Sequence, residues 1–390
     1  FWAIAMLIAV GGSVVCGKYL GQKKKDLANQ VFTTTMIVGL ACAGLMLVLG
    51  VTFIDQIISG LGANEPEIAG MVNVYLGIIL WCTPFFVFEL IAFYFVRLAG
   101  NPILASGAFI IGSAVNVMLD YIFIVKFNWG LMGAAYATGF SAALVCVILL
   151  PYFLKKKSRL KFSKPMTDIA VLIKAYINGL SEFANEISIG VTALIFNWVM
   201  ISRLGMDGVA ALTIINNIWL MGLFTSIGMC DALQPIISQN FGARNPERIT
   251  EFLKMASYAV LAVAVIMITA MLIYPDLLIS IFLESGAINT REIAAEFMFY
   301  LWPAFLFIGL NILLTVYFTS MQKPLESTYI AFLRSFILPA TALLLLPLWI
   351  GDVGMYIALP LAEALTFIVA VLLYSKAKPD YIISNDPQHD

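Results

Sequence analysis

Charged residues are scarce in this sequence. Asp, Glu, Lys and Arg make up 12% of the 390 residues, and 62% are hydrophobic; a soluble domain is about 25% charged. Because a soluble chain needs more polar residues to cover its surface, this composition indicates a protein whose solvent is a lipid bilayer. The formal net charge of −1 gives no electrostatic basis for binding nucleic acid, and we expect no such partner.

Histidine and paired cysteine motifs are also missing where enzymes need them. The one histidine, His389, lies in a polar tail, and the five cysteines are scattered without a CxxC spacing. These absences disfavour Ser-His-Asp and Cys-His catalysis and a metal cluster, and no GxxxxGK[ST] phosphate loop is present. The absence of these motifs argues against a membrane-embedded enzyme. We therefore predict no enzymatic activity, no cofactor and no metal site.

Long apolar runs are what the sequence has in abundance. A membrane-spanning helix needs about 20 mostly apolar residues, and no ten-residue alternating pattern typical of a membrane β-barrel is found. The sequence thus predicts an all-α integral membrane protein with eleven transmembrane helices. The runs lie near 1–16, 31–53, 71–96, 102–126, 131–154, 176–202, 208–238, 255–283, 294–320, 325–350 and 353–375.

The distribution of basic residues predicts the orientation. Eighteen of the 22 Lys and Arg residues fall in the loops after odd-numbered runs, whereas the alternate loops carry only Lys126, Arg203 and Arg291. Loops rich in Lys and Arg face the cytoplasm, so we expect a multi-pass cytoplasmic membrane protein with cytoplasmic basic loops and carboxy terminus. The first run then enters from outside, and we expect one more helix upstream, twelve in all.

An internal repeat predicts two lobes. The segments GLMGAAYATGFSAAL from Gly130 and GDVGMYIALPLAEAL from Gly351 match in one constant register, and Gly21 and Gly242 match in the same register. We predict pseudo-symmetric halves of six helices each. The predicted parts are an amino-terminal lobe lacking its first helix (1–154), a cytoplasmic linker (155–175), a carboxy-terminal lobe (176–378) and a polar tail (379–390).

Acids inside apolar helices are the candidate functional groups, since they are costly in hydrocarbon and usually face a cavity or a partner. Ser113, Asn116 and Asp120 share one helix face by their i, i+3, i+7 spacing. Their oxygen atoms suit a hard cation or a hydrogen-bonded proton site, and Thr138 on the next helix adds a hydroxyl. A packing contact between helices is the alternative explanation.

A second set follows the linker, where Glu182 and Glu186 stand one helical turn apart among Asn178, Ser181 and Asn185. Two such carboxylates repel when both are ionised, so a shared proton or Na⁺ is expected; a position at the cytoplasmic interface is the alternative. Asp231, Gln234 and Ser238 form a third set with i, i+3, i+7 spacing, of which Asp231 and Gln234 are secondary candidates. Three further intramembrane charges have no assigned partner: Glu89, Arg334 and Glu363.

Three motifs carry a resemblance to a known family. They are NVMLDYIFIVKFNWGLMGAAYAT (116–138), GLSEFANEISIGVTALIFN (179–197) and GMCDALQPIISQNFGARN (228–245). The chain resembles exporters of the multidrug and toxic compound extrusion (MATE) family over essentially its whole length, less the first helix. The resemblance implies twelve helices in two six-helix lobes arranged in a V that opens alternately to either side of the membrane.

The resemblance also implies ligands for a coupling ion. Related members hold a cation in the amino-terminal lobe with a first-helix Asp and with Asn, Asp and Thr partners, which Asn116, Asp120 and Thr138 match; the first-helix Asp has no counterpart here. Another branch uses a seventh-helix Glu, matched by Glu182 or Glu186, and a tenth-helix Asp, which the run 294–320 lacks.

The expected function is therefore cation-coupled (H⁺ or Na⁺) antiport, a form of secondary active transport in which amphipathic, often cationic drugs and toxins are exported by alternating access. The expected partners are the bilayer and small amphipathic organic substrates, and we expect a monomer. A flippase for lipid-linked saccharides, from the same wider superfamily, is the alternative. Such a flippase would line its cavity with several cationic residues, whereas only Arg334 lies deep in an apolar run.

Overall fold

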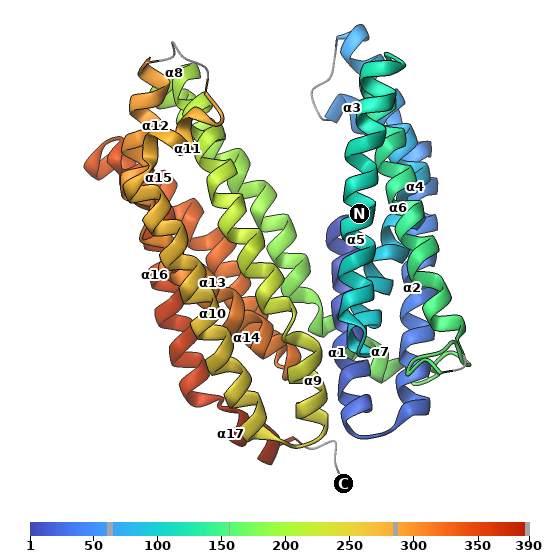
Figure 1. Ribbon diagram of the computed structural model, residues 1–390. Coiled ribbons are helices and arrows are strands. Elements are labelled where there is room, and N and C mark those ends of the chain that lie inside the picture. Colours follow the sequence, from blue (N-terminus) through green and yellow to red (C-terminus); the bar gives the residue numbers. More distant parts are fainter. Residues whose placement is uncertain (61–64, 156, 284–287, 387–390) are drawn as a thin grey trace. The chain divides into compact units, whose positions relative to one another are not determined.

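The protein is built from helices in two compact units. The computed structural model describes residues 1–60, 65–155, 157–283 and 288–386, and every regular element within these ranges is a helix (Figure 1). One unit comprises Phe1–Gly179 and the other Leu180–Asp390. The all-α membrane fold predicted from the sequence is confirmed.

The first unit contains five long helices and two short ones, with a π-helical turn between α5 and α6. Its elements are α1 (Trp2–Gly21), α2 (Lys25–Thr52), α3 (Ile54–Gly60), α4 (Pro66–Leu98), α5 (Pro102–Asp120), η1 (Tyr121–Lys126), α6 (Gly130–Leu154) and α7 (Ile169–Asn178).

The second unit repeats this pattern and begins with a longer helix. Its elements are α8 (Leu180–Asp231), α9 (Gln234–Gly242), α10 (Pro246–Ile273), α11 (Pro275–Ser280), α12 (Ile288–Leu301), α13 (Ala304–Ser320), α14 (Pro324–Phe332), η2 (Leu333–Ile337), α15 (Leu338–Ile350), α16 (Val353–Lys376) and α17 (Pro379–Ser384).

The predicted apolar runs all fall on helices. In the described part of the chain, nine helices are long and apolar enough to cross a membrane, or ten if α12 and α13, bent by 56°, form one span. One of the nine, Ile169–Gly242, includes α8, whose 52 residues would extend roughly 78 Å as one straight helix, far beyond a hydrocarbon core of about 30 Å. Gly205 interrupts α8 with non-helical dihedrals (φ 65°, ψ −151°). The two sides of Gly205 correspond to the separate runs 176–202 and 208–238.

The register of the sequence repeat recurs in the backbone. The starts of α2, α3 and α6 precede those of α10, α11 and α16 by nearly the same stretch of chain that separates Gly130 from Gly351. Lys23 and Arg244 match in this register and both have positive φ (63° and 54°), as do Gly130 and Gly351 (52° and 67°). Left-handed residues end or redirect helices, so the two units change direction at equivalent turns.

The same kind of local signal starts one helix in each unit, at positions that do not match in the repeat. Asn101 and Asn245 each precede a proline, and their side-chain oxygens accept hydrogen bonds from the backbone N–H groups of Leu104 and Arg248, both at 3.2 Å. Asparagine is a favoured N-cap, and proline suits the first helical position because it has no N–H to satisfy. The Asn-Pro pairs therefore fix the starts of α5 and α10.

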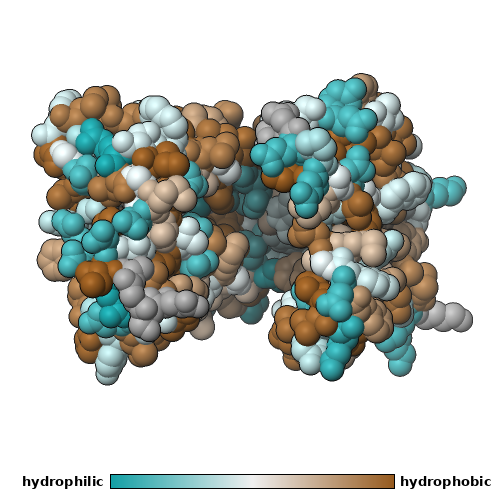
Figure 2. Space-filling view, turned by 90° about the horizontal axis from the view of Figure 1, so that it is seen from above, coloured by the Kyte–Doolittle hydropathy of each residue, from teal (hydrophilic) through white to brown (hydrophobic). Residues whose placement is uncertain are grey.

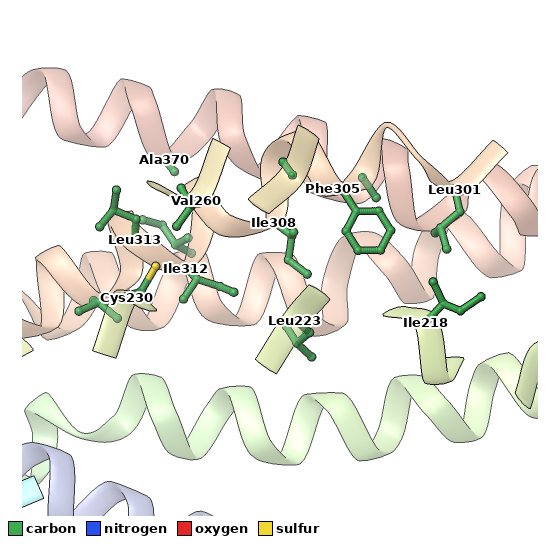
Figure 3. Packing of buried hydrophobic residues seen from close by; sticks show 14 of the residues in the cluster. Ile218, Leu223, Cys230, Val260, Leu301, Phe305, Ile308, Ile312, Leu313 and Ala370 are labelled. Carbon is green, nitrogen blue, oxygen red and sulfur yellow. The ribbon is translucent and has the colours of Figure 1, made fainter. Parts of the chain in front are cut away.

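Each unit has its own apolar core. In the second unit, side chains from α8, α10, α12, α13 and α16 meet between the helices (Figure 3), with Leu223, Phe305 and Ile308 among them. Many large apolar side chains are instead exposed on the helices, such as Ile103 and Trp349, as expected of surfaces in contact with lipid. Figure 2, a view from above, shows hydrophilic residues interspersed with hydrophobic ones.

The segments predicted as linker and tail carry structure of their own. Residues 155–175 belong to the first unit, where the backbone N–H groups of Lys161, Ser163 and Met166 donate to side chains at the start of α2, at 3.0, 2.9 and 2.7 Å. The segment predicted as a polar tail begins with α17, whose Ile382 and Ile383 are buried; His389 lies outside the described residues.

Close packing of α1 against α7 provides a test of the first unit. A Cβ atom at Gly11 would collide with the backbone carbonyl of Ala175. We expect Gly11→Ala to destabilise the protein by about 1–3 kcal/mol, as overpacking does. The control Gly107→Ala places its methyl group in open space and should be neutral or slightly stabilising. Thermal unfolding in detergent measures both; equal melting temperatures would contradict this packing.

Candidate functional site

Asp120 is the acid of the first unit that the sequence analysis predicts to bind a cation or a proton. It is the last residue of α5, and the π-helix η1 follows immediately. Its Oδ1 atom is buried and makes no hydrogen bond within the described part of the chain. π-Helical turns are frequent at functional sites, and a buried carboxylate oxygen without a donor is suited to accept a proton or to ligate a cation.

Asn116 and Thr138 lie at a similar level of the α5–α6 pair. Gly133 of α6 lies next to Phe123, and Gly112 of α5 lies next to Ser141 and Val145. These two contacts show that α5 and α6 run antiparallel, and Asn116 and Thr138 lie between them. The Thr138 hydroxyl donates to the carbonyl of Ala134 in its own helix at 2.9 Å. Asn116, Asp120 and Thr138 thus share one region without hydrogen bonds between their side chains in the described structure.

Glu182 and Glu186 occupy the first turns of α8 in the second unit. Glu182 interacts electrostatically with Asp231, Glu186 and Arg334. The neighbouring Ser181 is fully buried and shares a hydrogen bond of 3.0 Å with Thr319 of α13. The candidate set of Glu182 and Glu186 therefore lies near that of Asp231, although the two are distant in sequence. The chain changes direction within α8, at Gly205, and this brings Asp231, its last residue, near its first turn. Gln234 follows as the buried first residue of α9.

Arg334 is the centre of a polar network that joins α8 to η2. Its side chain is 7% exposed, and its Nη2 donates to Oδ1 of Asn185 at 3.0 Å. The same oxygen accepts from the hydroxyl of Ser335 at 2.7 Å, and Thr192 donates to the backbone carbonyl of Ser335 at 2.6 Å. A buried charge needs such partners. The Nη1 atom of Arg334 has no hydrogen-bond partner in the described structure.

Glu363 and Asn311 are linked in the same unit. Asn311 on α13 is fully buried, and its Nδ2 donates to Oε2 and to the backbone oxygen of Glu363 at 2.7 and 2.9 Å. Asn311 lies in the run 294–320 that lacks an Asp, and the sequence analysis did not select it. The sequence flagged Glu363 and Arg334 as charges in apolar runs but could not assign their partners. Glu89 is buried in α4 of the first unit.

A cavity of about 110 Å³ lies in the second unit next to these groups. Both halves of α8 line it with Phe196, Trp219 and Leu223, while η2 contributes Arg334 and α16 contributes Glu363. In the described ranges, no group of three or more His, Cys, Asp and Glu side chains is arranged to hold a metal ion. The site thus combines an apolar chamber with a small number of charges, as ligand pockets do.

The repeated membrane-spanning helices, the buried acids and this chamber define a multi-pass membrane transporter. The sequence pattern of the MatE family matches residues 1–122 and 187–342, which is well over half of the chain. The chain belongs to the MatE family.

Two multidrug export proteins are similar to nearly the whole chain. The multidrug export protein MepA of Staphylococcus aureus is 24% identical over 371 residues, covering 94% of this chain and 80% of the relative. The protein of the same name from Staphylococcus saprophyticus is 24% identical over 372 residues, with the same coverage.

Solved structures share the fold. An outward-facing multidrug resistance MATE family transporter of the MOP superfamily superposes with a TM-score of 0.90 at 20% identity, over 97% of this chain and 85% of that one. A MOP superfamily transporter from Pyrococcus furiosus gives a TM-score of 0.89 at 20% identity, with the same coverage.

The network around Arg334 yields a stability test. We expect Asn185→Ala to remove the acceptor shared by Arg334 and Ser335 and to destabilise the protein by about 1–3 kcal/mol, because a buried charge loses its partner. Asn197→Ala is the matched control, since Asn197 is exposed and donates only to Ala193 in its own helix. Chemical or thermal unfolding of the two variants should differ clearly; similar losses would refute the role of Asn185.

Proposed function

We propose that the protein is a cation-coupled antiporter, driven by H⁺ or Na⁺, that exports amphipathic and often cationic drugs and toxins by alternating access. Membership of the MatE family and relatives named as multidrug export proteins support this proposal. The observation that carries the coupling step is a buried carboxylate oxygen without a donor in the half-buried Asp120 of the first unit, together with the clustered acids of the second.

The acid of the first unit is Asp120. Its buried Oδ1 has no hydrogen-bond donor in the described structure, so this oxygen is left without the partner that a buried polar atom normally has. Bound H⁺ or Na⁺ would supply such a partner, and Asn116, one turn earlier on α5, and Thr138, at a similar level of α6, would contribute further oxygen atoms. Asp120 is thus the proposed main coupling residue, with Asn116 and Thr138 as its partners.

The acids of the second unit form the other proposed coupling group. Glu182 experiences the negative charges of Glu186 and Asp231 and the positive charge of Arg334. Several carboxylates near each other in a low dielectric favour uptake of a cation or a proton, which lowers their mutual repulsion. Gln234, close to Asp231 in the chain, is a secondary candidate.

The bias of Lys and Arg supports the proposed topology, in which the basic loops and the carboxy terminus are cytoplasmic and the protein acts in the cytoplasmic membrane as a monomer. Transport of this kind changes no covalent bond, so we propose neither an enzymatic step nor a cofactor. The lipid-linked saccharide flippase is not favoured, because the relatives above are named for multidrug export.

A test of the coupling residues is efflux of a fluorescent cationic dye from cells that express the protein. Asp120→Asn and Glu182→Gln remove the charge with little change in shape, and we expect each to reduce efflux toward the rate of cells without the protein. Asp276→Asn, at an acid at the start of α11, should leave efflux unchanged. If Asp120→Asn and Glu182→Gln variants with normal membrane levels extrude dye as fast as wild type, these assignments are wrong.

The orientation is tested by labelling with a membrane-impermeant maleimide. We expect Ser59→Cys, at the end of α3, to react in intact cells, and Lys157→Cys, in the basic loop after α6, to react only after permeabilisation. Both positions are exposed, and none of the five native cysteines is. The reverse pattern of labelling would invert the proposed topology.

A further inference from the structure

Exposed basic side chains gather at one end of the first unit, the lower end in Figure 1, where α1 turns into α2 and the chain leaves α6. The exposed Lys and Arg residues of these two segments, here called the basic rim, are Lys23, Lys24, Lys25, Lys155, Lys157, Arg159, Lys161 and Lys164. Two acids accompany them in the described ranges, Asp26 and Asp168, and Oδ1 of Asp168 accepts from the backbone N–H groups of Ala170 and Val171 at 3.0 and 3.4 Å. Among the described residues, no member of the basic rim forms an ion pair within 4.0 Å. The positive charges are thus left to repel one another.

The equivalent end of the second unit is nearly balanced in charge. It comprises the turns α9–α10 and α13–α14, the first turns of α10 and the segment that follows α16. Its described basic residues are Arg244, Arg248, Lys254, Lys323, Lys376 and Lys378, and its described acids are Glu247, Glu251, Glu326, Asp380 and Asp386. The bias of Lys and Arg toward one side of a membrane applies to both ends alike, so it does not explain why the first unit carries so few acids among its basic residues.

The loop that carries most of the basic rim is fixed against the first unit. Its backbone is hydrogen-bonded to side chains at the start of α2, and its Leu160 and Met166 are buried. Arg159 lies at the α4–α5 turn, where a Cβ atom on Gly100 would stand 3.3 Å from Nη1 of Arg159. Because the backbone is anchored, the basic side chains form an array with a set position at the ends of α2, α4 and α6.

Large apolar side chains are exposed among these charges. Leu154, directly before Lys155, is 66% exposed, Phe162 is 43% exposed, and Ile103, in the first turn of α5 after Gly100, is 84% exposed. A soluble polyanion offers nothing to such side chains. A phospholipid offers a phosphate to the basic groups and acyl chains to the apolar ones, and this end of the apolar helices is where headgroups and hydrocarbon meet.

We propose that the basic rim is a binding surface for anionic phospholipids. Arg159, Lys161 and Lys164 bind the headgroup phosphates, and the exposed apolar side chains beside them contact the acyl chains. The negative headgroups reduce the repulsion among the positive charges of the basic rim. The nearly balanced end of the second unit has no comparable preference. This inference does not depend on what the protein transports or on which ion drives it.

A site-specific quenching assay identifies the lipid that gathers at the basic rim. Thr167→Cys, at an exposed position three residues after Lys164, carries a fluorophore; none of the five native cysteines is exposed. The full chain is reconstituted in phosphatidylcholine vesicles with a small fraction of nitroxide-labelled phosphatidylglycerol or nitroxide-labelled phosphatidylcholine, which quench only at short range. Ser375→Cys, exposed at the equivalent end of the second unit, is the matched control position. No substrate or ion gradient is needed.

We expect phosphatidylglycerol to occupy the surroundings of position 167 about fivefold to tenfold more often than phosphatidylcholine, because two or three basic side chains attract each headgroup. The preference at position 375 should be less than about twofold, since acids there offset the basic residues. Raising NaCl from about 0.02 to about 0.5 M should remove most of the preference at position 167, because salt screens exposed charges.

Charge variants separate the basic rim from the net charge of the protein. The combined substitution Arg159→Gln, Lys161→Gln and Lys164→Gln should remove most of the preference at position 167. The backbone hydrogen bond of Lys161 is retained in this variant, and all three side chains are exposed. The matched control loses the same charge in the second unit, through Arg248→Gln, Lys254→Gln and Lys376→Gln, and should keep the preference. Thermal unfolding confirms that both variants are folded, and the salt series on the unsubstituted rim tests the proposal without them.

Several results would overturn the proposal. One is equal quenching by the two lipids at position 167, and another is the same preference at positions 167 and 375. A preference that survives in the folded first variant, or that falls equally in both variants, would assign the effect to something other than the basic rim. Sodium phosphate should weaken the preference no more than NaCl of equal ionic strength; a much stronger effect would indicate a site for free phosphate instead.

Discussion

Hydrocarbon offers no water to a polar group, and most of this structure follows from that constraint. Helices satisfy their own backbone groups, which explains why apolar composition and an all-helical fold occur together. Side chains meet the same requirement through neighbours: Asn185 accepts from Arg334 and Ser335, and Asn311 donates to Glu363. Oδ1 of Asp120 and Nη1 of Arg334 are among the buried atoms of the described residues for which this requirement is not met.

The two units share a backbone plan but differ in chemistry. Equivalent turns at Lys23 and Arg244, and at Gly130 and Gly351, preserve the order and direction of the helices. The first unit places a single acid at the start of a π-helical turn, whereas the second surrounds its π-helical turn with an arginine, several acids and an apolar chamber. A repeated scaffold can thus carry different interior side chains in its two halves without a change in the order of its helices.

Most of the fold was predictable from the sequence, because hydropathy and the constant register of the repeat are properties of the chain itself. Less of the site was predictable. The shared helix face of Asn116 and Asp120 follows from the helical period of about 3.6 residues, but their lack of mutual hydrogen bonds depends on rotamers. The approach of Asp231 to Glu182, and the partners Asn185 and Asn311, depend on how helices distant in sequence pack, which no local pattern contains. The buried Ile382 and Ile383 of α17 were overlooked within a segment dominated by polar residues.

The central claim is that export of an organic substrate is coupled to entry of a cation. The most direct measurement is movement of a fluorescent cationic dye in proteoliposomes under a pH gradient and, separately, under a Na⁺ gradient, with empty liposomes as the blank. The account predicts dye transport driven by one of the two gradients and a matching dye-dependent flux of that ion. Dye transport that is indifferent to both gradients, or no transport by folded protein under either, would contradict it.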